Sequence, residues 1–552
     1  MSKIRIEALG GMGENGKNMY LVEVDQQIFV LDAGLIYPQI DLYGIDAVVP
    51  NIDYLIENQE RIAGIFISHG HDDHIGALPY LLKNIKTKVF GTHFTISLIE
   101  TLLKGDGLNI SDYKLFRINS NKTLKFGNVQ VSFFNANHAL PDSAGIIIHT
   151  KDGDIVYATD FNFSKALNER YKISYDKILE LSKNKVLAVM AESVGISDYN
   201  RTTSEQRYEI DIYNSFIKDY KNIYIACYST DVSRIQQVTN LAVKLGKKIA
   251  VVSRKHEQII KTAIETKYLD IPQDSFVELD GTITENLVVF VVGNFTDPYY
   301  LISRMINGQV KNVKITQDDL IIGLSDALGG TEKYVLHVLD EIYRKDINYL
   351  SIENKILRTS HATKDDLTQL YAISKPKYVI PIKGEERHLS RHLDLLEELG
   401  YNNEILDLTD GKVIEFVDGK FTNYSEIKIG EVYVDGTLTG SVNEEIVNER
   451  NLLATDGVIE VVVYIDSKNK KIVKPANIIT KGFVYTVFKE EDLENLKQTV
   501  STVIEGYFKK KKIVMSDLES AINHELKKGI RKIIKTSTMI IPIVVDLKNI
   551  KY

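Results

Sequence analysis

Short apolar segments alternate with amphipathic segments along the first part of the chain. Residues 28–31 and 154–158 are strand-like apolar runs, and an alternating apolar pattern leads up to His138. Strands that alternate with amphipathic segments are typical of a sheet layered with helices. The pattern therefore predicts a layered α/β domain over residues 1–200.

A second α/β pattern covers residues 201–347. It contains strand-like runs at residues 223–226 and 249–252, with a helical run after Val232 between them. This order of strand, helix and strand predicts a separate α/β domain.

The last part of the chain predicts a small α+β domain. Residues 431–451 are rich in Gly, Glu and Asn and are interpreted as a linker. Beyond them, residues 458–464 and 539–545 have the composition of strands, and two helical stretches lie between these strands. We expect these elements to form a domain over residues 452–552.

Composition favours a soluble protein of the cytoplasm. The chain has 552 residues, of which 44% are hydrophobic, enough for two to four domains with cores of their own. Its one cysteine, Cys227, excludes an internal disulfide and favours a reducing compartment. The sequence has no secretory signal region and no apolar run of about 18 residues, so we expect no membrane association. The net charge of −8 argues against general coating of nucleic acid but leaves a locally basic channel open.

The run of residues 68–74 carries the strongest chemical signal, because it has the spacing H-x-H-x-D-H. An apolar strand leads into it, which predicts His69 and His71 at the strand end and Asp73 and His74 on the first helical turn. Two ligands would then face each of two metals. Imidazoles and a carboxylate suit Zn²⁺, which lowers the pKa of a bound water to about 7 and so promotes hydrolysis. A solvated His-rich loop is the alternative, but four ligand types at fixed offsets after a strand argue against it.

Further ligands are expected at the ends of other strands. His138 follows a strand pattern, and Asp160 follows the apolar run 154–158. An Asp at this place can bridge two metals about 3.5–4 Å apart. Each residue alone would also fit a core histidine or a capping aspartate. Asp32 ends the run 28–31 and is expected to fix the tautomer of a metal-bound imidazole, with a turn aspartate as the alternative.

The ordered set of these residues resembles the metallo-β-lactamase superfamily. Residues 9–20, 32–38 and 138–143 narrow the resemblance to the ribonuclease J family, and similar motifs continue to residues 482–485. The resemblance implies an α/β fold with a metallo-β-lactamase αββα sandwich, an inserted β-CASP α/β domain and a small α+β C-terminal domain. The implied domains are 1–200 and 348–430 for the sandwich, 201–347 for the insertion, 431–451 for a linker and 452–552 for the C-terminal domain.

The resemblance also implies functional residues, cofactors and partners. It implies one or two Zn²⁺ ions, with Mn²⁺ or Mg²⁺ as alternatives, an RNA substrate, and a homodimer or homotetramer formed through the C-terminal domain. The implied metal ligands are His69, His71, Asp73, His74, His138 and Asp160, the implied catalytic residues are His361, Asp73 and Asp160, and the implied supporting carboxylates are Asp32 and Glu192.

The sequence departs from the family in its phosphate-binding motifs. Where the family reads T-F-A-S-N-x-H-R, residues 227–234 lack the histidine and gain Asp231, whose charge predicts weak recognition of a 5′-monophosphate. The motif H-x-S-G-H is one residue shorter here and ends at His361. The residues expected to bind RNA phosphates are Ser229, Thr230, Ser233, Arg358 and Ser360.

A third departure removes a metal ligand. The family pattern P-x-H-G-E reads Pro-Ile-Lys-Gly-Glu at residues 381–385, so Lys383 stands where the family has a metal-binding histidine. Two functional classes follow from these departures. The chain is either a working ribonuclease, or a weak or inactive RNA-binding paralogue that acts as the partner of an active ribonuclease J. A third hypothesis is hydrolysis of a small lactone or thioester. It is disfavoured because the inserted domain would cover the open cleft that a small substrate needs.

Overall fold

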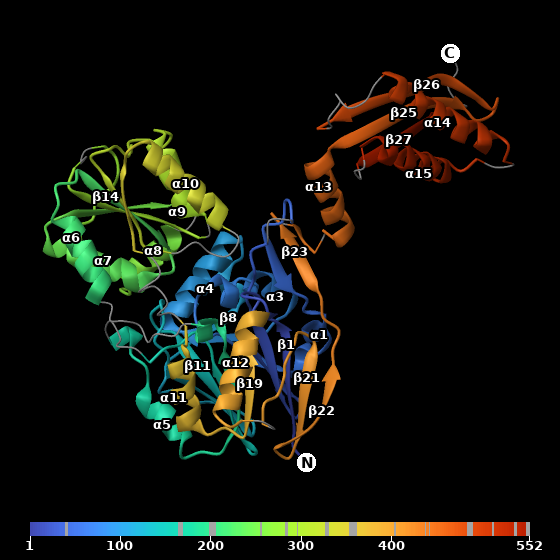
Figure 1. Ribbon diagram of the computed structural model, residues 1–552. Coiled ribbons are helices and arrows are strands. Elements are labelled where there is room, and N and C mark those ends of the chain that lie inside the picture. The colour runs from blue at the N-terminus through green and yellow to red at the C-terminus, as the bar shows by residue number, and fades with distance from the viewer. Residues whose placement is uncertain are drawn as a thin grey trace. The chain divides into compact units, whose positions relative to one another are not determined.

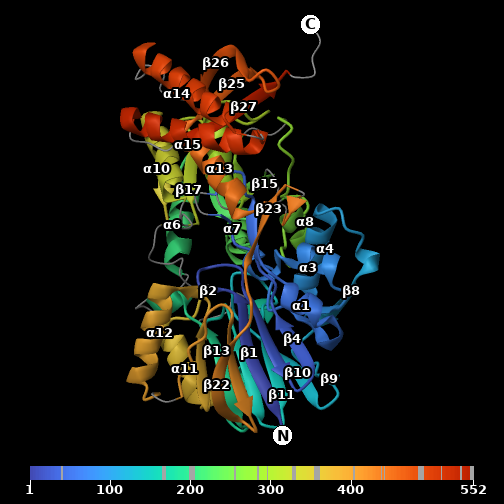
Figure 2. The ribbon, with the colours of Figure 1, turned by 90° about the vertical axis from the view of Figure 1, so that its right-hand side faces the viewer.

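A computed structural model gives the architecture of the chain (Figures 1 and 2). The structure divides into two compact units, one of residues 1–37 and 47–432 and one of residues 38–46 and 433–552. In the part of the chain that the structure describes, no helix is both long enough and apolar enough to cross a membrane. The structure describes residues 1–38, 42–163, 169–197, 206–253, 257–281, 285–294, 296–325, 331–352, 361–401, 404–436, 438–440, 442–482, 490–510, 513–534 and 538–547.

Two sheets packed face to face form the centre of the first unit. The first has the strand order β22-β21-β1-β3-β4-β6-β7-β8, and the second has the order β19-β13-β12-β11-β10-β9. The strands of the first sheet are β1 (Lys3–Gly10), β3 (Met19–Val24), β4 (Gln27–Leu31), β6 (Ile62–Phe66), β7 (Lys88–Thr92), β8 (Lys114–Ile118), β21 (Lys412–Val417) and β22 (Lys420–Glu426). Those of the second are β9 (Leu124–Phe126), β10 (Val129–Asn135), β11 (Ala144–Thr150), β12 (Gly153–Ala158), β13 (Val186–Glu192) and β19 (Tyr378–Ile382).

Apolar side chains from the facing sides of both sheets fill the space between them, as period-2 burial requires. Phe29 and Phe66 from the first sheet and Phe133 from the second belong to this core. Figure 2 shows α11 and α12 on one side of the sheets and α1 and α3 on the other. This order of layers confirms the predicted αββα sandwich. Its helices are α1 (Asp53–Glu57), α2 (Asp72–Ile75), α3 (Leu78–Asn84), α4 (His93–Gly105), α5 (Tyr175–Leu181), α11 (Lys364–Ser374) and α12 (Glu386–Glu398), and its shorter strands are β2 (Met12–Gly13), β5 (Ala47–Pro50) and β20 (Gly384–Glu385).

The inserted domain interrupts the second sheet between two neighbouring strands. β13 and β19 pair in parallel, Ala188 opposite Tyr378, although the whole insertion lies between them in the sequence. The insertion has its own parallel sheet of order β15-β16-β14-β17-β18, with α9 and α10 packed on one face. Its elements are α6 (Gln206–Phe216), β14 (Asn222–Tyr228), α7 (Val232–Lys244), β15 (Lys248–Ser253), α8 (Glu257–Glu265), β16 (Leu287–Gly293), α9 (Asp297–Ile306), β17 (Leu320–Gly323), α10 (Glu332–Arg344) and β18 (Asn348–Ser351).

The predicted α+β domain near the C-terminus is confirmed. Three strands of order β26-β25-β27 carry α14 and α15 on one face, with an apolar core between strands and helices. The region predicted as a linker is partly regular, because the Asn443 side chain caps a helix by accepting from the backbone N–H of Ile446 at 2.9 Å. The elements are β23 (Glu431–Asp435), β24 (Leu438–Thr439), α13 (Glu444–Asp456), β25 (Val458–Asp466), β26 (Lys471–Lys481), α14 (Glu490–Phe508), α15 (Met515–Ile534) and β27 (Met539–Asp546).

Candidate metal centre

The H-x-H-x-D-H run begins in the loop after β6 and continues into the short helix α2, which contains Asp73 and His74 as predicted. A loop after β4 holds this turn by its backbone, since the N–H of Ala33 donates to the His74 carbonyl at 2.8 Å. Gly34 of the same loop passes so close that a Cβ there would lie 1.6 Å from the carbonyl oxygen of Asp73. Glycine is therefore required at position 34 for the turn to keep its place.

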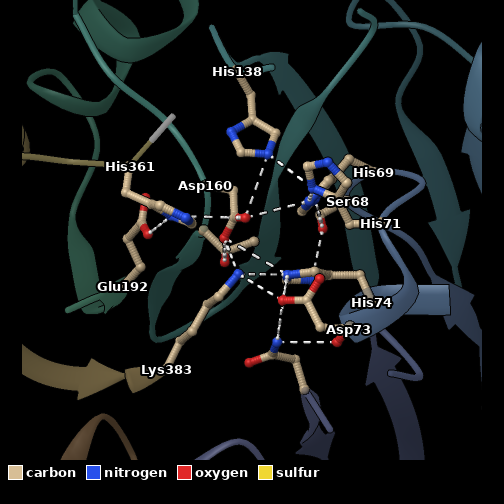
Figure 3. Close-up of polar contacts among 12 residues, drawn as sticks. Ser68, His69, His71, Asp73, His74, His138, Asp160, Glu192, His361 and Lys383 are labelled. Atoms are coloured by element: carbon tan, nitrogen blue, oxygen red, sulfur yellow. Dashed lines mark hydrogen bonds and ion pairs between the residues drawn. The ribbon is translucent and has the colours of Figure 1, made fainter. Parts of the chain in front are cut away.

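Three imidazoles and one carboxylate converge on a single point beside α2 (Figure 3). His71 Nδ1 lies 2.9 Å from His69 Nε2 and 3.0 Å from His138 Nε2. Asp160 Oδ2 lies 3.3 Å from His69 Nε2 and 3.5 Å from His138 Nε2. Burial and the neighbouring imidazoles lower the pKa of His71, which favours the neutral form that binds metals. Three imidazole nitrogens and one carboxylate oxygen fit a tetrahedral cation such as Zn²⁺.

A buried chain of hydrogen bonds around Asp32 orients the rings of His69 and His74. Asp32 accepts from His74 Nδ1 at 2.7 Å and from the Ser68 hydroxyl at 2.8 Å, and the Ser68 hydroxyl lies 3.0 Å from His69 Nδ1. The backbone N–H of Ser68 and the hydroxyl of Tyr157 also donate to Asp32, at 2.7 and 2.6 Å. Because the Ser68 hydroxyl donates to Asp32, it accepts from His69 Nδ1, and the Nε2 lone pair of His69 faces the first group of ligands. The roles of Ser68 and Tyr157 were not predicted from the sequence, although Ser68 stands beside His69 in the motif.

The second group of candidate ligands contains Asp73, His74 and Asp160. The ammonium of Lys383 lies among all three, 3.0 Å from Asp73 Oδ2, 2.8 Å from His74 Nε2, and in contact with Asp160 Oδ1 (Figure 3). Although burial lowers the pKa of Lys383, Asp160 and Asp73 outweigh it and raise this pKa above its usual range. The ammonium therefore carries its charge between the two carboxylates, with His74 Nε2 beside it. A second divalent ion does not fit this set of residues, because the ammonium fills the position where their ligand atoms meet.

A third group contains His361, Glu192 and Asp160. His361 Nδ1 lies 2.6 Å from Glu192 Oε2 and 3.8 Å from Asp160 Oδ2. Burial lowers the pKa of His361, but the two carboxylates outweigh it and raise this pKa above 6.5. The His361 side chain is 27% exposed, so it is open to a bound molecule while Glu192 fixes its ring.

Three of the residues predicted to bind RNA phosphates, Ser229, Thr230 and Ser233, lie between the end of β14 and the first turn of α7. The Ser229 hydroxyl donates to the Asn294 side chain at 3.1 Å, and the Ser233 hydroxyl donates to Asp231 at 3.1 Å. Asp231 caps α7 and forms an ion pair with Arg234 at 2.6 Å, so its negative charge has a cation beside it. Thr230 lies between them and is half-buried.

The predicted residues therefore fall into three sets. His69, His71 and His138 meet at the first group, Asp73 and His74 at the second and Glu192 and His361 at the third, and Asp160 is shared by all three groups. Arg358 and Ser360 lie outside the described residues. Asn18 was missed by the sequence reasoning, and its side-chain amide donates to Asp73 Oδ2 at 3.1 Å. Asn294 was missed as well, and its amide reaches from the insertion to Asp72 at 2.6 Å.

Four segments of the chain match known protein families. Residues 12–190 match the metallo-β-lactamase superfamily, and residues 220–342 match the β-CASP domain of ribonuclease J. Residues 354–406 match an RNA specificity domain of Zn-dependent metallo-hydrolases, and residues 445–547 match the C-terminal domain of ribonuclease J.

Full-length relatives agree with these matches. The chain is 32% identical over 548 residues to a protein named ribonuclease J 2 from Staphylococcus epidermidis, covering 99% of this chain and 98% of that protein. Identity and coverage are the same for a ribonuclease J 2 from Staphylococcus aureus. A crystallised protein of unknown function from Enterococcus faecalis V583 aligns with a TM-score of 0.48 at 16% identity, over 69% of this chain and 94% of that one. The full-length identity, together with domain matches that follow one another along the chain, shows that the chain belongs to the ribonuclease J family of metal-dependent ribonucleases.

Proposed function

We propose that the chain hydrolyses RNA with a single tightly held metal, Zn²⁺ in the first place and Mn²⁺ or Mg²⁺ as alternatives. The observation that supports this proposal is the convergence of His69, His71, His138 and Asp160, whose ligand atoms all lie within 4.8 Å of one another. We further propose that it acts in the cytoplasm in RNA maturation and decay, as a 5′–3′ exonuclease, an endonuclease or both.

The bound cation would supply Lewis acidity and a water molecule activated for attack on phosphorus. Asp160 borders all three groups, so it would hold the attacking water in line with the scissile bond. Attack breaks the bond from phosphorus to the 3′ oxygen and leaves a 5′-phosphate on the downstream RNA. Because Glu192 accepts the Nδ1 proton of His361, the other ring nitrogen would donate to the departing oxygen or to a phosphoryl oxygen. Asp73, at the edge of the centre, completes the proposed catalytic set.

A second candidate function is a weak or inactive paralogue that binds RNA together with an active ribonuclease J. The observation that favours it is Lys383, which stands among the ligands of the family's second metal. In this case the C-terminal domain would form a homodimer or homotetramer, or would join the paralogous partner.

Metal analysis combined with RNA cleavage tests the first proposal against the second. We expect the purified chain to contain one metal per molecule and to cleave a labelled 5′-monophosphorylated RNA. His71→Ala removes one of three imidazoles and should lower both the metal content and the cleavage rate at least tenfold. Full metal content in His71→Ala would refute the ligand assignment. Wild-type protein that holds one metal but does not cleave RNA would favour the paralogue reading.

A further inference from the structure

The backbone conformation and backbone hydrogen bonds of Lys383 hold its side chain inside the metal centre. The residue is 1% exposed and lies directly after β19, with a φ of 51°, in the left-handed region that lysine rarely adopts. Its N–H donates to the Tyr20 hydroxyl at 3.2 Å, and its carbonyl accepts from the N–H of Ser193 at 3.0 Å. Strain of this kind persists only where surrounding contacts enforce it, and it is concentrated at functional sites.

The ammonium makes the contacts that a second metal ion would make. Its three polar neighbours are the side chains of Asp73, His74 and Asp160, which form one of the candidate metal-binding groups among the described residues. Figure 3 shows the Lys383 side chain entering the group from the side opposite His138. An ammonium has three hydrogens to donate, and here it lies between two carboxylate oxygens with one imidazole nitrogen beside them.

The charges of the neighbouring carboxylates also favour a positive group at this position. The carboxylate of Asp160 is buried and that of Asp73 is half-buried beside it, so uncompensated negative charge is disfavoured here. In a two-metal centre, the second cation would compensate them. Here a covalently attached positive charge compensates them at all times and would repel a divalent ion at the same point.

We propose that Lys383 is a protein-supplied replacement for the second metal ion, which holds Asp73, His74 and Asp160 in place whether or not metal is present. Lys383 is a positioning residue, since its buried ammonium acts through Asp160 on the first group. The inference rests on the proposed function only in placing one exchangeable metal at that first group. If Lys383 were only a lost metal ligand, removal of its ammonium would leave the centre unchanged. The proposal instead predicts that this removal disturbs the centre.

Three variants test this role. Lys383→Met keeps the apolar stem but removes the charge, and Lys383→His restores the imidazole of the family pattern. Lys17→Met is the matched control, because Lys17 is also a buried lysine, 4% exposed, paired with the two carboxylates of Glu14 and Glu431. Each protein is stripped with a chelator and then equilibrated with MnCl₂. Bound metal per chain and the thermal unfolding midpoint are measured along the titration.

We expect wild type and Lys17→Met to bind one Mn²⁺ per chain, with Lys17→Met less stable but equally responsive to metal. Metal-free Lys383→Met should unfold below wild type, and its midpoint should rise more steeply with Mn²⁺ because the freed carboxylates attract the ion. Lys383→His should bind two Mn²⁺ per chain, against one in wild type.

Two results would overturn the proposal. One is wild-type protein that binds two Mn²⁺ per chain with Lys383 in place. The other is a Lys383→Met variant whose metal count and metal-dependent midpoint match those of Lys17→Met. This comparison tests the proposal even if Lys383→His does not fold. A loaded wild type that fails to cleave RNA would refute the proposed activity but would leave these metal counts unchanged, so the two failures are distinguishable.

Discussion

Replacement of Asp32 should damage the metal centre without touching a proposed ligand of the first metal. The Asp32 side chain is completely buried and accepts four hydrogen bonds, from the N–H and the hydroxyl of Ser68, from His74 and from Tyr157. In Asp32→Ala these donors lose their acceptor. At about 1 kcal/mol for each donor, the lower end of the usual range, the loss is about 4 kcal/mol.

The backbone adds to this loss, because Asp32 has a φ of 62°. Aspartate and asparagine tolerate this left-handed conformation better than alanine, for which it costs about 1 kcal/mol. The total for Asp32→Ala is then about 5 kcal/mol. Asp32→Asn avoids the backbone contribution, but its NH₂ group would face donors that now meet a carboxylate oxygen, so it separates the two effects.

Metal affinity should fall with stability. Asp32 orients His69 through Ser68, and loss of such a partner typically lowers metal affinity about 10- to 100-fold. The assays are denaturant unfolding of the metal-free protein and a competition titration with a metal-binding dye. Asp154→Ala is the control, since Asp154 is also buried and accepts from His149 and Asn184 at the opposite end of β12. It should lose stability but keep its metal affinity. An Asp32→Ala variant with wild-type metal affinity and a loss below about 1 kcal/mol would refute this reasoning.

Three further predictions concern RNA, assembly and pH. Cleavage should favour a 5′-monophosphate over a 5′-hydroxyl RNA by less than about tenfold, or about 1.4 kcal/mol, because Arg234 is paired with Asp231. The cleavage rates of the two substrates are compared, and a larger preference would contradict this prediction. Truncation near residue 445 should abolish the homodimer or homotetramer in size-exclusion chromatography, and an unchanged oligomer would count against a role of the C-terminal domain in assembly. Burial, with Glu23 beside it, raises the pKa of Glu7 from 4.5 to about 8, so its contribution to stability is complete below pH 4.5 and is lost as pH rises through 8. Glu7→Gln should flatten that decline, on the order of 3 kcal/mol between pH 5 and 9 in urea unfolding, and an unchanged pH profile would show that Glu7 does not cause it.

Local sequence predicted the residues of the first two ligand groups because their spacing and strand context are local. His69, His71, Asp73 and His74 stand within one turn, and β12 before Asp160 is a plain apolar run. The position of the Lys383 ammonium was not predictable in this way. It depends on the return of β19 beside β13 after the insertion, which is a tertiary event.

Other differences also have local physical reasons. The segment 431–451 looked like a linker from its polar composition, but Asn443 begins a helix there. β26 was not predicted, because lysines and a proline interrupt its apolar pattern. The partner of Asp231 could have been found, since an aspartate that caps a helix stands three residues before an arginine that can reach back to it.

The return of the chain to the first domain also determines when the protein can fold. β1 lies between β3 and β21, and its pairing with β21 joins Lys3 to Val417. At a synthesis rate of about 5–20 residues per second, roughly 20–80 s pass between the appearance of these two strands at the ribosome. The insertion, whose parallel sheet uses only residues 222–351, can complete its core before then. The first domain, together with its metal centre, should therefore be the late event of co-translational folding, and its early strands must wait with one edge unpaired.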